Sequence, residues 1–142
     1  MDWKLKNKPE AKISEESAQA QVFSLLEFYQ IDVESLPADR RPNLEFALDK
    51  LAGFVRQGLV EIQAPKVIHH LKNPPGAVPA IEYGEVGGIN TVAMDRRDPK
   101  DTYGRIYELL GSLSGLGADA IQALKGVDLI VAENVGVLFQ YR

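Results

Sequence analysis

The residues best suited to catalysis or metal binding in this chain are two adjacent histidines, His69 and His70. They are the only histidines in the sequence, which also contains no cysteine. The run Val67-Ile68-His69-His70-Leu71 is typical of a strand, in which neighbouring side chains point to opposite faces. The two imidazoles therefore cannot easily bind one metal ion, and no thiolate is present as a ligand or nucleophile. We expect neither a metal site nor a catalytic histidine.

Motifs for nucleophilic catalysis and nucleotide binding are also missing. Gly111-Ser112-Leu113-Ser114-Gly115 places a leucine where a Gly-x-Ser-x-Gly elbow has its serine. Gly84, Gly87 and Gly88 do not match the dinucleotide-binding spacing, and no Walker lysine follows them. The sequence therefore predicts no catalytic residue and no cofactor site. We interpret the chain as a binding protein rather than an enzyme.

Composition and charge argue against some classes of binding partner. The 142 residues are 45% hydrophobic and 25% charged, an ordinary balance for a globular protein, and the formal net charge is −4. The basic doublets Arg40-Arg41 and Arg96-Arg97 each lie beside acids, which favours solvated turns over a nucleic-acid surface. No apolar run follows Met1 as in a signal peptide, and none approaches a membrane span. We expect a soluble, cytoplasmic protein without nucleic-acid or membrane partners.

The first helix carries the candidate partner-binding residues. Ser14 followed by Glu15-Glu16 is an N-cap signal. One helical face then collects the apolar residues Ala18, Val22, Leu25, Leu26 and Tyr29. Phe23 and Phe28 fall roughly 100° to either side of this stripe. This helix therefore either packs on two sides or presents Phe23 and Phe28 to a partner. The two phenylalanines can be buried within the monomer, contact a second copy in a homo-oligomer, or bind a different protein.

A second helix is predicted after Pro42, with an apolar stripe and Gly58 as its C-terminal glycine. The stripe consists of Leu44, Leu48, Leu51 and Val55. Two helices with a short connection are typical of an antiparallel pair. We therefore expect residues 1–58 to form an N-terminal arm and a helical hairpin.

The periodicity changes after Gly58. Residues 59–62, 67–71 and 81–85 are predicted to be short strands of a mainly antiparallel sheet, with a turn at Asn73-Pro74-Pro75-Gly76. C-terminal helices are predicted over residues 89–94, from an Asp98-Pro99 cap to Ser114, and over 118–124 and 128–139. The expected fold is α+β. Residues 59–142 form the second part, which can pack with the hairpin as one domain.

A series of features follows in order over residues 67–139. They are a strand ending Leu71-Lys72-Asn73-Pro74, the segment Ile81-Glu82-Tyr83-Gly84-Glu85, a short helix ending Ala93-Met94-Asp95, the helix end at 109–116, and Ala120-Ile121 leading through Leu124 and Asp128 to Val137-Leu138-Phe139. In order and spacing this stretch resembles the tail assembly chaperones of long-tailed phages, of the Mu-like and related contractile type. Gly84 departs from the pattern, in which a basic residue is usual, and residues 1–63 add a helical module that compact members lack.

The resemblance implies a non-enzymatic function. Such chaperones bind the long, helical tape measure protein and keep it soluble before the tail tube polymerises around it. Exposed apolar stripes on such a client aggregate unless they are covered, and an acidic protein with spare apolar helix surface can cover them. The alternatives are a structural phage tail or head-completion subunit that stays in the virion, and a small ligand-binding protein or enzyme.

Overall fold

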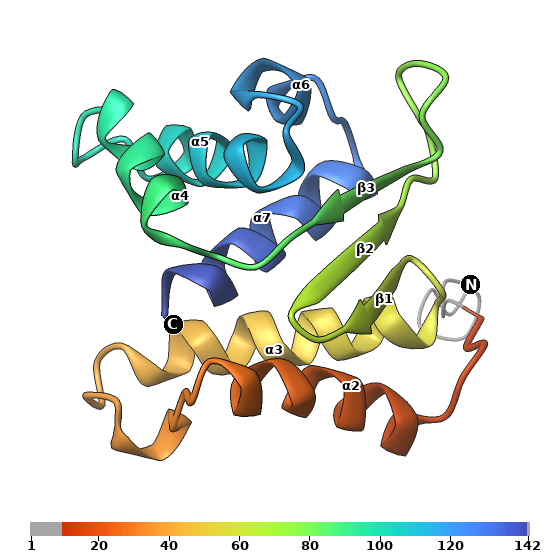
Figure 1. Ribbon diagram of the computed structural model, residues 1–142. Helices are drawn as coiled ribbons and strands as arrows, with labels where there is room; N and C mark the ends of the chain where they lie inside the picture. The colour runs from red at the N-terminus through yellow and green to blue at the C-terminus, as the bar shows by residue number, and fades with distance from the viewer. Residues whose placement is uncertain (1–9, 142) are drawn as a thin grey trace, which may run out of the picture.

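Two long helices, α2 (Glu15–Phe28) and α3 (Arg41–Arg56), begin the fold in a computed structural model that describes residues 10–141 (Figure 1). Residues 1–9 of the expected N-terminal arm lie outside the described residues. The Ser14 hydroxyl accepts a hydrogen bond from the Ser17 amide at 3.1 Å, so the predicted N-cap is confirmed. A short 3₁₀ turn, η1 (Val33–Ser35), lies in the connection between the two helices.

The end of α3 follows from the conformation of one glycine. Gly58 has a φ of +80°, in the left-handed region that glycine adopts without strain. Its amide donates to the Val55 carbonyl at 3.1 Å, and the Leu59 amide donates to the Phe54 carbonyl at 3.0 Å. This pair of bonds is a Schellman motif, which satisfies the last helical carbonyls and turns the chain into the sheet.

Three short strands follow in the order β1-β2-β3. They are β1 (Val60–Gln63), β2 (Lys66–His70) and β3 (Ala80–Tyr83), and both neighbouring pairs are antiparallel. His69 stands opposite Val60 on one side and Ile81 on the other, so these side chains share the buried face. The predicted strands are confirmed, with boundaries displaced by one or two residues.

The C-terminal helices are α4 (Gly88–Ala93), α5 (Thr102–Ser114), α6 (Ala118–Gln122) and α7 (Val127–Gln140), with the 3₁₀ turn η2 (Met94–Arg96) after α4. The predicted start of α5 at Asp98-Pro99 is wrong. The Asp101 carboxylate caps this helix by accepting the Gly104 amide at 2.9 Å. The Asp98 carboxylate accepts the Lys100 amide at 2.8 Å instead, a local Asx turn that competes with capping.

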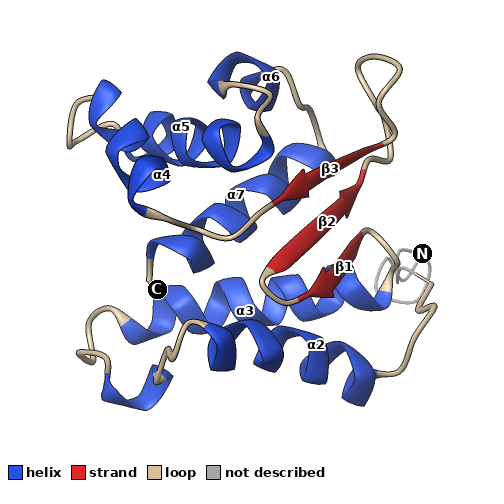
Figure 2. Ribbon diagram, in the orientation of Figure 1, coloured by secondary structure: helices blue, strands red, loops and turns tan. Residues whose placement is uncertain are grey.

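Helix α7 is the element around which the others pack. It contacts α3 on one side and α5 on the other, and the sheet spans from the α2–α3 hairpin to α5 (Figures 1 and 2). A single cluster of buried apolar side chains joins the hairpin, the sheet and the C-terminal helices, from Leu25 and Leu51 to Tyr83 and Phe139. The fold is α+β, with helices at both ends of the sequence and a small antiparallel sheet between them.

Candidate functional site

The two aromatic residues singled out by sequence, Phe23 and Phe28, both lie at the surface of α2, with 58% and 43% of their area exposed. The Phe28 ring contacts the Tyr29 ring edge-on, with centroids 5.1 Å apart, and Tyr29 packs against Phe139 in the same manner. The Tyr29 hydroxyl also accepts a hydrogen bond from the Val86 amide at 3.0 Å. Tyr29 therefore connects α2 to the C-terminal helices, whereas most of the Phe23 side chain is exposed to solvent.

Phe23 stands over a hollow of about 500 Å³ between α2 and α3. Leu26 and Leu48 are half-buried in its walls, and Val22 is buried beneath it. A second hollow of about 670 Å³ shares Phe23 and Leu26 and continues toward η1. We call the two together the hairpin groove, whose apolar surface comes from Val22, Phe23, Leu26, Ile31, Val33 and Leu48.

The hairpin groove has the chemistry of a protein-binding surface. Both hollows are open rather than enclosed, and the polar groups lining them are carboxylates and glutamine amides from Glu16, Gln19, Glu27, Gln30 and other positions. Among the described residues, no histidine, serine or lysine lines either hollow, so this part of the chain places no nucleophile and base at hydrogen-bond reach there. An amphipathic helix laid along the seam would cover its apolar floor.

A second candidate is a buried polar cluster between β2, β3 and the start of α7. His69 Nε2 lies 3.6 Å from an Asp128 carboxylate oxygen, and both side chains are almost completely enclosed. The two oxygens of Asp128 accept the backbone amides of Lys72 and Asn73, each at 2.8 Å. Asp128 therefore fixes the chain where β2 ends, across 55 residues of sequence.

Burial controls the ionisation of this cluster. Desolvation lowers the pKa of His69 to about 4, although the nearby Asp128 carboxylate opposes that shift. Burial also raises the pKa of the Tyr83 phenol well above its ordinary value, and Asp128 adds to the effect. Among the described residues, neither the His69 ring nitrogens nor the Tyr83 hydroxyl has a hydrogen-bond partner. The imidazole is thus neutral at neutral pH.

The buried cluster is positioned to stabilise the fold rather than to catalyse a reaction. His69 and Tyr83 are 0% exposed and Asp128 is 1% exposed, so a substrate has no route to their polar atoms. His70 lies on the opposite face, exposed, with Nε2 3.8 Å from a Glu61 carboxylate oxygen. The expected separation of the two histidines onto opposite faces is therefore confirmed.

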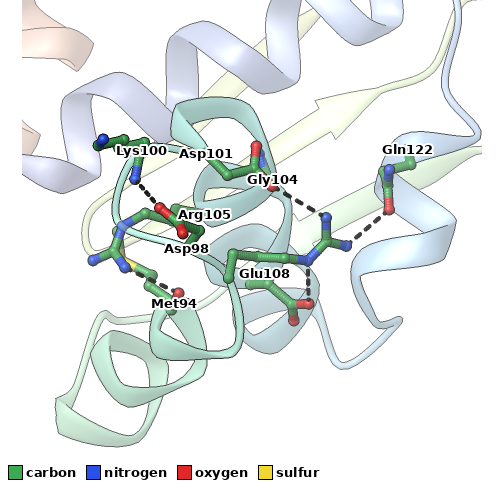
Figure 3. A network of polar contacts seen from close by, with 9 residues as sticks. Met94, Asp98, Lys100, Asp101, Gly104, Arg105, Glu108 and Gln122 are labelled. Atoms are coloured by element: carbon green, nitrogen blue, oxygen red, sulfur yellow. Dashed lines mark hydrogen bonds and ion pairs between the residues drawn. The ribbon is translucent and has the colours of Figure 1, made fainter.

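An ion-pair network holds the loop before α5 against the helix (Figure 3). Arg97 Nε donates to the Glu108 carboxylate at 3.1 Å, and its Nη2 donates to the Gln122 side-chain oxygen at 3.1 Å. Arg105 Nη1 donates to the Met94 carbonyl at 3.2 Å. The expectation that Arg96-Arg97 forms a solvated turn is wrong for Arg97, whose side chain is 29% exposed and crosses from the loop to α5 and α6.

Among residues 10–141, no three histidine, aspartate or glutamate side chains gather as metal ligands. Over the same residues, none of the helices combines the length and apolar character that crossing a bilayer requires. Of the two aromatic residues singled out by sequence, Phe23 lines both hollows and Phe28 lines neither. Sequence reasoning did not place Leu48 or Ala52 beside Phe23. Only the apposition of α3 with α2 brings those two beside Phe23.

No family model, curated protein or solved structure matches the chain.

Proposed function

We propose that this protein is a non-enzymatic phage tail assembly chaperone, which binds the tape measure protein in the bacterial cytoplasm and keeps it soluble before tail tube polymerisation. The exposed Phe23 ring over the hairpin groove carries the proposal. A large aromatic side chain above an apolar groove is typical of a protein-binding site, because covering it removes apolar area from water. The resemblance over residues 67–139 supplies the class of client.

The shape of the groove fits such a client. A tape measure protein is long and helical, and its apolar stripes are exposed until the tube surrounds them. The seam between α2 and α3 can take a third helix, with Phe23, Leu26 and Leu48 contacting its apolar stripe. Several copies bound along one client would add avidity without any new kind of contact.

The proposed client contact lies in the helical module that compact family members lack. The groove is formed within residues 16–52, whereas the resemblance begins near residue 67. We therefore assign client binding to the α2–α3 hairpin, and the sheet and C-terminal helices support it through α7 and Tyr29.

Co-expression with a phage tape measure protein, followed by a pull-down, tests the proposal. Phe23→Ala should weaken client binding by about 30-fold, because truncating an aromatic anchor typically costs about 2 kcal/mol. Phe28→Ala should weaken it less, since Phe28 lines neither hollow of the groove and its ring packs on Tyr29. Phe46→Ala is the matched control, because Phe46 is 61% exposed but lies outside the groove.

Thermal melts of the same variants separate binding from folding. Exposed substitutions usually change stability by about 0.5 kcal/mol or less, so all three variants should keep nearly the wild-type melting temperature. Client binding by Phe23→Ala at wild-type strength would refute the assignment of the groove. Mass spectrometry of purified virions separates a chaperone, which should be absent, from a structural tail or head-completion subunit, which would be present.

A further inference from the structure

Carboxylates lie at several positions along the hairpin groove. Glu16 and Asp49 line the hollow between α2 and α3, and Glu27, Asp32 and Glu34 line the hollow toward η1. Among residues 10–141, no lysine, arginine or histidine lines either hollow. The charged side chains of the described residues that line the apolar seam are therefore all carboxylates, although Arg41 lies beside η1, where its Nη2 donates to the Glu34 carbonyl at 2.8 Å.

These carboxylates are available to a partner. Among the described residues, none of the five takes part in an ion pair, although ion pairs occur at the sheet and around α5. Within residues 10–141, the Asp32 carboxylate is the one of the five that has a hydrogen bond, from the Glu34 amide at 3.2 Å. Like charges along a groove repel an acidic ligand and attract a basic one, which affects partner choice and association rate.

We infer that the hairpin groove binds an amphipathic helix whose apolar stripe is flanked by lysine or arginine. The inference rests on the proposed function, to which it adds the chemistry of the client segment. Helix α2 has 14 residues and is about 21 Å long, so a ligand helix of similar length matches the seam. The ligand's apolar residues contact Phe23, Leu26 and Leu48, and its basic residues reach the carboxylates on both edges.

The charge pattern disfavours a second copy of this chain as the occupant. Pairing two grooves face to face would bring Glu16, Glu27, Glu34 and Asp49 close to the same residues of the partner molecule. Such like-charge contacts are unfavourable, and the net charge of −4 on each chain adds to the repulsion. A basic helix from a different polypeptide meets no such penalty.

Two synthetic helical peptides of about 14 residues test the inference, with the same leucine stripe but lysine flanks in one and glutamate flanks in the other. Fluorescence anisotropy with the full chain should show the lysine peptide binding about ten-fold more tightly at about 50 mM salt. The difference should shrink at about 500 mM salt, because exposed charges are then screened. Phe23→Ala should weaken binding of the lysine peptide, whereas Phe46→Ala should not.

Charge reversal at the groove supplies the matched comparison. The double variant Glu27→Lys/Glu34→Lys should lose the preference for the lysine peptide. The control Glu45→Lys/Glu85→Lys changes net charge equally at exposed positions outside the groove, and it should keep most of the preference. Equal loss in both double variants would attribute the preference to net charge and overturn the inference.

Other occupants give different results. If both peptides bind equally well through Phe23, the requirement for basic flanks is overturned but the proposed function is not. If neither peptide binds, the inference is overturned, and the pull-down with the tape measure protein tests the proposed function separately. A dimer in sedimentation that Phe23→Ala dissociates would make a second copy the occupant. Tighter peptide binding by Trp3→Ala, by about ten-fold or more, would instead identify the chain's own Lys-rich residues 1–9 as the occupant.

Discussion

Acidification should destabilise this protein through His69, the imidazole buried between β2 and α7. Burial lowers its pKa in the folded state to about 4, whereas an imidazole in the unfolded chain has a pKa near 6.5. Between these values the unfolded chain binds a proton that the folded chain does not. The stabilising contribution is therefore fully present above about pH 6.5 and is lost as the pH falls toward 4.

The size of the effect follows from the two pKa values. Their difference corresponds to about 2 kcal/mol of lost stability at pH 5 and about 3 kcal/mol at pH 4, relative to neutral pH. Solvent does little to screen this effect, because the His69 side chain is 0% exposed. Asp128 faces the imidazole at 3.6 Å, and His70 adds a small effect in the same direction as burial.

Urea unfolding at several pH values between about 7 and 4 measures this contribution. His69→Gln removes the titrating group, so its stability should fall with acid less steeply than that of the wild type, by about 2 kcal/mol at pH 5. His70→Gln is the control, because the His70 side chain is exposed on the opposite face of β2. The stability of this variant should fall with acid as steeply as that of the wild type. Parallel pH profiles for His69→Gln and the wild type would refute the buried neutral imidazole.

Two further substitutions test contacts that hold the fold together. Asp128→Ala should lower the free energy of unfolding by about 3–5 kcal/mol, because the amides of Lys72 and Asn73 lose charge-assisted hydrogen bonds of 2.8 Å. Chemical denaturation measures this change, and a decrease of less than about 1 kcal/mol would contradict the role of Asp128. Gly111→Ala should cost about 1–3 kcal/mol, since a Cβ there would lie 2.4 Å from backbone atoms of the α5–α6 turn. Gly76→Ala, with nothing within 4 Å, should melt like the wild type, and equal melting temperatures for both glycine variants would contradict the close approach.

Local sequence signals were sufficient where a structural element depends on its own residues. Ser14 and the following acids predicted the start of α2, and Gly58 predicted the end of α3, because capping involves backbone groups only a few residues away. The change of periodicity at Gly58 and near Gly88 likewise predicted the sheet. The α+β class follows from these patterns, since periods of 3.6 and 2 place apolar residues on one face of a helix or strand.

The same kind of local signal was ambiguous before α5. Asp98 and Asp101 are both suitable caps, and Pro99 favoured the first of them. The Asp98 carboxylate instead binds the Lys100 amide, and the chain turns once more before Asp101 caps the helix. Arg97 directly precedes this turn, and its guanidinium reaches Glu108 of α5.

Residue types and their spacing were enough to indicate the set of elements and the broad apolar surface on α2, including Phe23. Packing in three dimensions places Leu48, Leu26 and Phe23 around one groove, and it brings Asp128 to the end of β2 across 55 residues. Contacts between distant segments depend on how helices and strands pack, and that packing is set by the whole core rather than by any local pattern.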